Sequence, residues 1–92
     1  MIEFEWDEAK AVANLAKHGV RFADAAAVFD DPSALDIEDR SMDYGEVGRR
    51  VVGIGHGRHL TVAYTERGET IRLISARKAT RTERREYDNA RW

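Results

Sequence analysis

The sequence predicts a single α+β domain over residues 1–92, in which helices cover one face of an antiparallel sheet of about five strands. Three observations lead to this fold class. Apolar residues recur at helical spacing before residue 30, alternate with polar residues in four segments between residues 35 and 74, and give way to a helix-start signal near residue 80. The expected order is one strand, two helices, a meander of four strands and a C-terminal helix.

The first third of the chain predicts the N-terminal strand and the two helices. Residues 2–6 alternate apolar and acidic side chains, which is the period of a half-buried strand. Asp7 is a good N-cap for the first helix, and Gly19 is a typical helix stop. Between them, apolar residues keep helical spacing at Ala9, Val12, Ala13 and Ala16. Pro32 ends the second helix, because proline cannot continue the hydrogen-bond ladder. The apolar residues of that helix are Phe22, Ala25, Ala26 and Phe29.

Four strands and a last helix are predicted for the rest of the chain. The strand segments are centred on residues 35–38, 49–56, 60–64 and 71–74. Because most of the loops between them are short, the four strands are expected to pair as an antiparallel meander. Thr80 and Glu83 have the spacing of a capping box, which predicts a helix that runs to about Ala90.

Composition excludes several classes of protein. A chain without cysteine has no disulfides, no thiolate nucleophile and no cysteine-based zinc site. No apolar run approaches the roughly 20 residues needed to cross a bilayer, and the acidic N-terminus lacks the basic stretch of a signal peptide. We therefore expect a cytoplasmic protein with no membrane partner. The chain also lacks the motifs of a P-loop, a dinucleotide-binding turn, a serine-hydrolase elbow and a zinc protease.

Charge is divided unevenly along the chain. Residues 1–46 hold 4 Lys and Arg against 12 Asp and Glu, whereas residues 47–92 hold 11 against 5. Twelve of the 15 basic residues are arginine, whose planar guanidinium binds phosphate through two parallel hydrogen bonds. The basic half predicts a surface for a phosphate-bearing ligand. The alternative is that the two oppositely charged halves pair with each other within the fold.

Eight arginines of the basic half are candidates for that surface. They lie on the third strand, the last strand and the C-terminal helix of the predicted fold: Arg49, Arg50, Arg58, Arg72, Arg77, Arg81, Arg84 and Arg85. Neighbouring strands are about 4.8 Å apart, so several of these side chains can converge on one face of the sheet. Arg72 and Arg77 point to opposite faces of a regular strand, however. A bulge or a strand end near Ser75 is needed to bring them together.

A few other side chains offer chemistry, each with a structural alternative. His18 suits proton transfer near neutral pH, or it caps the end of the first helix. Glu46 precedes Arg49 by three residues, which places an acid beside an arginine or forms a surface ion pair. Tyr87 suits stacking on a base or packing in the core. The acidic residues and the two histidines in residues 56–59 lack the spacing of a good metal site, so we expect no metal and no cofactor.

Four sequence blocks, spread over nearly the whole chain, together resemble one protein family. The blocks are Phe4-x-Trp6-Asp7-x-x-Lys10-Ala11-x-x-Asn14-x-x-Lys17-His18-Gly19-Val20-x-Phe22, Gly45-Glu46-x-x-Arg49, Arg72-x-Ile74-Ser75-Ala76-Arg77-x-Ala79 and Glu83-Arg84-x-x-Tyr87. In this order they resemble the BrnT toxins of type II toxin–antitoxin systems. The Gly-Glu-x-Arg block of the family has one extra residue here before Arg49, which leaves the role of this arginine open to being shared with Arg50.

The resemblance implies a fold, an activity and a partner. BrnT proteins are similar in fold to RelE-type ribonucleases and inhibit translation by cutting RNA. Their antitoxin, BrnA, neutralises the toxin and carries the DNA-binding module. A BrnA-like antitoxin would therefore be the cognate partner of this chain, in a heterotetramer built around the antitoxin dimer. Operator DNA would be contacted only through the antitoxin.

With this resemblance, we expect a metal-independent endoribonuclease in which the 2′-hydroxyl of the RNA attacks the adjacent phosphorus. The residues expected to carry catalysis are Arg72, Arg77, His18 and Glu46. The residues expected to bind RNA are Lys17, Arg49, Arg50, Arg81, Arg84 and Tyr87. One alternative is a non-catalytic module that binds RNA or a protein through the same basic surface. A second alternative is a structural interaction protein whose charges pair internally.

Overall fold

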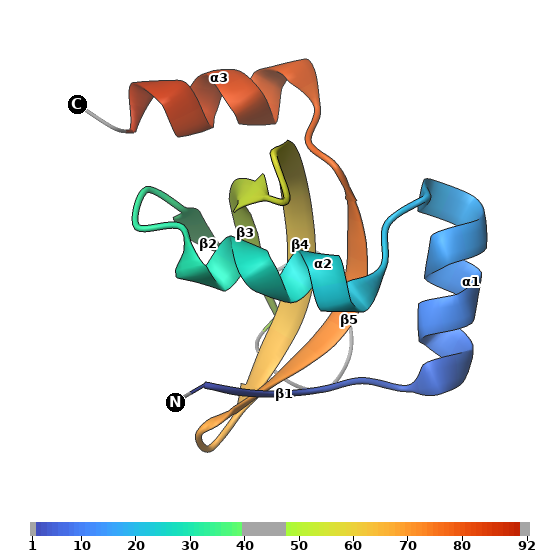
Figure 1. Ribbon diagram of the computed structural model, residues 1–92. Coiled ribbons are helices and arrows are strands. Elements are labelled where there is room, and N and C mark those ends of the chain that lie inside the picture. Colours follow the sequence, from blue (N-terminus) through green and yellow to red (C-terminus); the bar gives the residue numbers. More distant parts are fainter. Residues whose placement is uncertain (1, 40–47, 91–92) are drawn as a thin grey trace.

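A single sheet with the strand order β1-β5-β4-β3-β2 organises the computed structural model, which describes residues 2–39 and 48–90 (Figure 1). The strands are β1 (Glu3–Glu5), β2 (Leu35–Asp39), β3 (Gly48–Gly55), β4 (Arg58–Arg67) and β5 (Thr70–Lys78). The helices are α1 (Glu8–His18), α2 (Phe22–Ala26), the 3₁₀ helix η1 (Ala27–Asp30) and α3 (Arg81–Asn89). The α+β class and the element order therefore agree with the sequence.

The sheet is mixed, which corrects the expectation of an antiparallel sheet. Strands β2 to β5 pair antiparallel, as the short loops predict, but β1 pairs parallel with β5. Phe4 of β1 lies opposite Ile71 of β5. Alternation of apolar and polar residues is the same in a parallel and an antiparallel strand, so the three residues of β1 held no signal for its direction.

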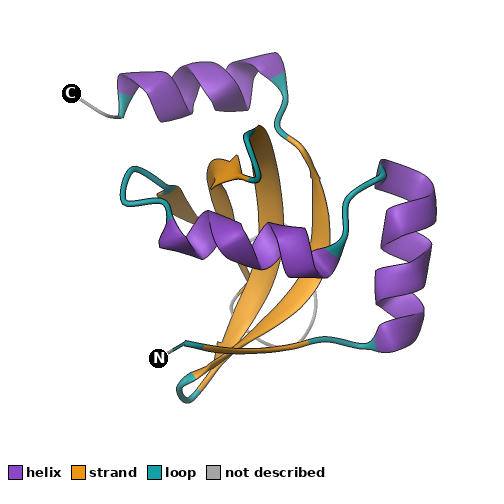
Figure 2. Ribbon diagram, in the orientation of Figure 1, coloured by secondary structure: helices purple, strands orange, loops and turns teal. Residues whose placement is uncertain are grey.

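One face of the sheet carries the main core. Alternate residues Leu60, Val62 and Tyr64 of β4 are buried on this face, and α2 and η1 lie across it (Figure 2). A Cβ atom added at Gly53 of β3 would lie 2.8 Å from a methyl group of Val28 in η1. Glycine is therefore needed at this position because the helix approaches the strand so closely.

The C-terminal helix contacts the opposite face, so the helices do not all cover one face. Thr61 lies between Leu60 and Val62 on β4 and so points away from the main core. The Thr61 hydroxyl donates a hydrogen bond to Glu83 of α3 at 3.0 Å. In Figure 1, α3 lies across one end of the sheet, away from α2.

Helix α1 closes an open edge of the sheet. Strand β1 pairs with β5 only as far as Arg72, which leaves the later part of that edge free. Asn14 of α1 takes the place of a neighbouring strand there: its amide accepts a hydrogen bond from the Ala76 nitrogen at 3.0 Å and donates one to the Ala76 oxygen at 2.8 Å. The same amide nitrogen donates to the Val20 oxygen. This edge of β5 is therefore covered rather than left open to pairing with another chain.

The predicted helix ends are largely confirmed. Asp7 caps α1 with its side chain, and Gly19 ends the helix with a left-handed φ of 69°. Thr80 and Glu83 form the predicted capping box of α3. The second predicted helix is shorter than expected, since α2 ends at Ala26 and the chain continues as η1. In the described part of the chain, no helix is both long enough and apolar enough to span a membrane.

Candidate functional site

A bulge in β5 brings Arg72 and Arg77 to the same face of the sheet. Across from β4, Tyr64 pairs with Leu73 but Ala63 pairs with Ser75, so Ile74 is an extra residue in the ladder. Because one extra residue reverses the alternation, Arg72 and Arg77 both point away from the main core. The sequence required a bulge or a strand end near Ser75 to bring these two side chains together, and the bulge is present at Ile74.

Arg50 of β3 joins them on this face. Arg50 pairs with Ala63 of β4, which in turn pairs with Ser75 of β5. We call the three residues Arg50, Arg72 and Arg77 the arginine face. Arg72 and Arg77 pair with Thr65 and Thr61 of β4, so they are four ladder positions apart, or about 13 Å along the sheet.

Glu83 of α3 holds two of these arginines with one buried carboxylate. Arg77 forms a bidentate pair with Glu83, with Nη1 at 2.7 Å from Oε1 and Nη2 at 3.0 Å from Oε2. Arg50 donates to Oε2 from its Nη1 at 2.7 Å. The Thr61 hydroxyl and the Thr80 backbone nitrogen also donate to Oε1, at 3.0 and 2.8 Å. Two cations and one anion leave this cluster with a net positive charge.

These contacts set the charge state of Glu83. Burial, to only 4% exposure, would by itself raise the pKa of this carboxyl. The hydrogen bonds from Arg77, the Thr80 backbone and Thr61 outweigh burial and lower the pKa to about 2. Glu83 in turn raises the pKa of Arg77 through the hydrogen bond between them. The cluster is therefore ionised at neutral pH.

The arginines differ in how many donors remain for a ligand. Arg77 uses both Nη1 hydrogens, one towards Glu83 and one towards the Lys78 oxygen, and one Nη2 hydrogen. Its Nε–H and its second Nη2 hydrogen remain. Arg72 has a single loose ion pair, with its Nη1 3.5 Å from a carboxylate oxygen of Glu5. A buried Nε of Arg50 has no hydrogen-bond partner among the described residues.

Arg49 belongs to a different cluster, on the face of the main core. Its Nε donates to Asp36 at 3.2 Å and to the Tyr64 hydroxyl at 3.3 Å. The Tyr64 hydroxyl donates to Asp36 at 2.6 Å. Burial first, and the bond to Asp36 second, raise the pKa of Tyr64. Arg49 and Arg50, which the Gly-Glu-x-Arg block offered together, therefore lie on opposite faces of the sheet, and Arg50 is on the arginine face.

The structure describes one of the two predicted proton carriers, His18 of α1. His18 lies one helical turn after Asn14, on the side of α1 that faces β5, and is half-buried. Lys17 is exposed at the end of the same helix. Glu46 lies outside the described residues.

The three residues of the C-terminal helix that were predicted to bind RNA have different outcomes. Arg81 and Arg84 are exposed on α3. Tyr87 is only 2% exposed: its ring packs edge-on against His59, and its hydroxyl donates to Asp31 at 2.7 Å. This favours the packing alternative for Tyr87, because a buried ring is not offered to a base.

Sequence reasoning missed Glu83 and Thr61 as parts of this site. Glu83 carried the signal of a capping box, and that role is present in the structure, but its carboxylate also reaches the sheet. The contacts join residues 50, 61, 77 and 83 across four elements. Spacing along the chain holds no signal for such a cluster.

Within residues 2–39 and 48–90, no group of three or more His, Cys, Asp or Glu side chains lies close enough to hold a metal ion.

Comparison with known proteins identifies the family. No curated protein matches the chain. A family model described as the ribonuclease toxin BrnT of type II toxin–antitoxin systems matches residues 6–83, which covers most of the sheet, both N-terminal helices and Glu83. The chain therefore belongs to the BrnT family of ribonuclease toxins, which implies an RNA substrate and a protein antitoxin as partner.

Proposed function

We propose that this chain is a metal-independent endoribonuclease that inhibits translation and uses the arginine face to stabilise the transition state of RNA cleavage. The observation that carries the proposal is the bulge at Ile74, which turns Arg72 and Arg77 to one face beside Arg50. The family supplies the reaction class, and the face supplies cations where a phosphate becomes more negative.

The chemistry needs little beyond positive charge and two proton carriers. The 2′-oxygen of the RNA attacks the adjacent phosphorus and loses its proton to a base, while the bond from phosphorus to the 5′-oxygen breaks and that oxygen gains a proton from an acid. The products are a 2′,3′-cyclic phosphate and a 5′-hydroxyl. Between these states the phosphate carries two negative charges. Preorganised donors aimed at such charge are often the largest single contribution to catalysis.

Arg72 and Arg77 are the proposed cations for this step. The free donors of Arg77 are held in place by its bidentate pair with Glu83. Arg72 has a weak, partly exposed competitor in Glu5. A bidentate phosphate is a stronger partner for a guanidinium than a single carboxylate oxygen at 3.5 Å.

His18 and Glu46 are the proposed proton carriers, and the remaining basic residues are proposed to bind RNA. His18 is on the side of α1 that faces β5, the strand that carries Arg72 and Arg77. The proposed phosphate contacts are Lys17, Arg50, Arg81 and Arg84, whereas Arg49 lies on the opposite face of the sheet and is paired with Asp36. Tyr87 is buried, so we assign it to the packing of α3 rather than to a base.

Neutralisation is proposed to involve a BrnA-like antitoxin with an acidic segment that lies over the arginine face. In this proposal two toxins and two antitoxins assemble through the antitoxin dimer, and only the antitoxin touches operator DNA. A structure of the complex in which Arg72 and Arg77 stay open to solvent would count against this arrangement.

Cleavage of purified RNA in EDTA tests the proposed reaction. We expect the chain to generate fragments that end in a 2′,3′-cyclic phosphate, identified by mass spectrometry, either on free RNA or on messenger RNA in a translating extract. The translating arm is included because a ribosome-dependent toxin leaves free RNA intact. Intact RNA in both arms would favour the alternative, a non-catalytic module that binds RNA or protein through the same surface.

A further inference from the structure

A basic groove lies outside the arginine face, between the start of α3 and the β3–β4 turn. Two hollows of about 360 and 300 Å³ both have Ala79 and Arg84 in their lining, so they adjoin each other, and we call them together the groove. Its charged lining is almost entirely positive: Arg58, Lys78, Arg81, Arg84 and Arg85, with His59 beside them. Among the described residues that line it, Asp88 is the single acid.

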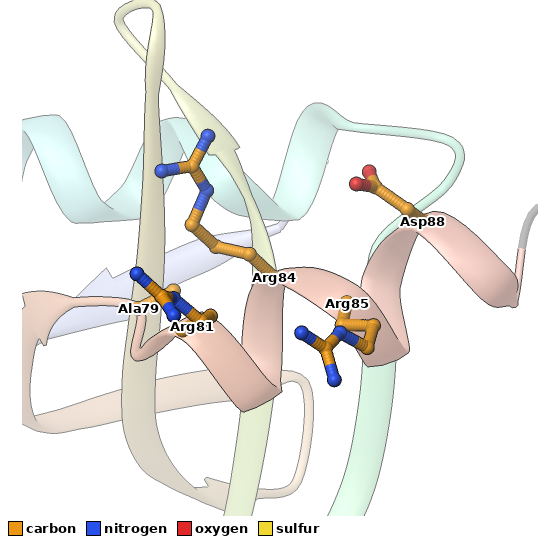
Figure 3. Close-up of a pocket in the computed structure, with 5 residues that line it drawn as sticks. All are labelled: Ala79, Arg81, Arg84, Arg85 and Asp88. Carbon is orange, nitrogen blue, oxygen red and sulfur yellow. The ribbon is translucent and has the colours of Figure 1, made fainter.

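The three arginines that α3 contributes to this groove differ in their partners from four arginines of the sheet. Four arginines of the sheet each form an ion pair with a carboxylate: Arg49, Arg50, Arg72 and Arg77. By contrast, none of the side chains of Arg81, Arg84 and Arg85 forms an ion pair or hydrogen bond with the part of the chain that the structure describes. Figure 3 shows these side chains along α3, with Arg84 directed away from Arg81 and Arg85. Arg84 also lines the hollow at the β3–β4 turn, so it connects the two halves of the groove.

This arrangement is locally unfavourable without a ligand. Arg81 and Arg85 are four residues apart on one helix, where like charges repel. Arg81 also occupies the first turn of α3, where the positive end of the helix dipole disfavours a cation. A bound anion relieves both costs, and the same helix end attracts it. Local rules are often broken in this way at functional positions.

We propose that this groove binds the phosphodiester backbone of single-stranded RNA next to the linkage that is cut. The inference rests on the proposed ribonuclease function and extends it to a second phosphate-binding region. The groove adjoins the arginine face at the start of α3, since Arg77 pairs with Glu83 of this helix, and Arg81 and Arg84 of the same helix line the groove. A strand that reaches Arg77 with one phosphate places the following phosphates along Lys78, Arg84 and Arg81. Contacts to the phosphodiester backbone carry no sequence information, so the groove is expected to add affinity rather than sequence preference.

The test uses a short single-stranded 2′-O-methyl RNA of mixed sequence, which lacks the attacking hydroxyl and is not cut. Binding is measured by fluorescence anisotropy over a range of NaCl concentrations. The Arg81→Ala/Arg84→Ala double variant is compared with Arg21→Ala/Arg67→Ala. Both double variants remove the same formal charge, but Arg21 and Arg67 are exposed residues that line neither hollow. Thermal unfolding checks that each variant is folded.

We expect the groove variant to bind roughly tenfold more weakly, because two exposed arginines no longer reach the phosphates. The slope of log K against log[NaCl] should shrink by about 1.4, since each phosphate of a single strand that the protein neutralises adds about 0.7 to it. The control variant should keep the wild-type slope. Equal weakening of RNA binding in the two variants would overturn the proposal, because only net charge would then matter. Unchanged RNA binding in the groove variant would also overturn it, and weakened capture of the antitoxin in that case would assign the groove to the protein partner.

Because the probe cannot be cut, this result is independent of the proposed reaction. A chain that binds the probe through the groove but cuts no RNA would reject the ribonuclease proposal and leave only RNA binding by the groove supported.

Discussion

Glu83 joins three parts of the molecule through one buried carboxylate. It accepts hydrogen bonds from Arg50 of β3, Thr61 of β4 and Arg77 of β5 while it caps its own helix at Thr80. A buried acid is costly unless it is paired and fully hydrogen-bonded, and here every contact is with a donor. The position of Arg77 therefore depends on a residue whose sequence signal concerns only the start of α3.

Replacing Glu83 with glutamine should lower the free energy of unfolding by about 2–3 kcal/mol. The amide keeps one acceptor but leaves Arg50 and Arg77 without a counter-charge, and hydrogen bonds to charged groups contribute about 1.5–3 kcal/mol each. The destabilisation is smaller than that of a fully buried pair because both arginines are partly exposed. Urea unfolding measures the change, with Glu86→Gln on the exposed side of α3 as the control. Equal stability of the two variants would mean that the cluster contributes nothing.

The same carboxylate predicts a decrease in stability in acid. Its pKa is about 2 in the folded chain, against an ordinary value of 4.5. Between these values the unfolded state binds a proton that the folded state does not, so lowering the pH favours unfolding. The contribution of Glu83 should be complete above pH 4.5 and should disappear as the pH falls towards 2. Urea unfolding of the wild type and Glu83→Gln across this range should show the difference between them shrinking, whereas parallel curves would contradict the lowered pKa.

At the scale of elements, β5 is shaped by its bulge and by its partly covered edge. The bulge sets which side chains share a face, and Asn14 of α1 satisfies the backbone of Ala76 where β1 no longer reaches. Both features lie in the stretch between Arg72 and Arg77. Helix α1 therefore fixes the strand that carries the proposed catalytic cations.

Replacing Asn14 with leucine should destabilise the chain by about 2–4 kcal/mol, because Ala76 and Val20 lose their side-chain hydrogen bonds near a buried site. Hydrogen exchange at the Ala76 amide should become faster at the same time. Ala16→Leu, on an exposed position of the same helix, is the control and should change stability by less than about 0.5 kcal/mol. Slow exchange at Ala76 in the Asn14 variant would show that another group covers this edge.

The sequence predicts elements well where the signal is local. Helix α1, its caps, the four-stranded meander and the capping box of α3 each follow from spacing within a dozen residues. The direction of β1 and the face contacted by α3 depend on partners far away in the chain, so no local sequence pattern predicts them. The bulge is an intermediate case: the position of Arg72 and Arg77 required an irregularity near Ser75, but only the register with β4 locates it at Ile74.

At the scale of the whole molecule, the uneven charge of the chain is used in two ways. Acids of the first half pair with arginines of the second half, as Asp36 does with Arg49 and Glu5 with Arg72. This is the internal pairing that the sequence left open. Helix α3 instead carries three arginines without an ion pair to the described part of the chain, and the arginine face keeps a net positive charge at Glu83. The molecule therefore combines internal pairing with surplus positive charge around the end of β5.

Substitution of Arg72 tests the central claim most directly, because Arg72 has only a loose ion pair with Glu5 and its removal should leave the fold intact. Arg77 is less suitable, since its removal also strips the buried carboxylate of Glu83 of a partner. The measurement is the rate of RNA cleavage by Arg72→Ala, with Arg21→Ala as the exposed control and the melting temperature of each recorded. We predict a rate lower by about 10²–10³-fold, the cost of removing one donor to the transition state, with an unchanged melting temperature. An Arg72→Ala chain that is folded and cuts RNA as fast as the control would contradict the role assigned to the arginine face.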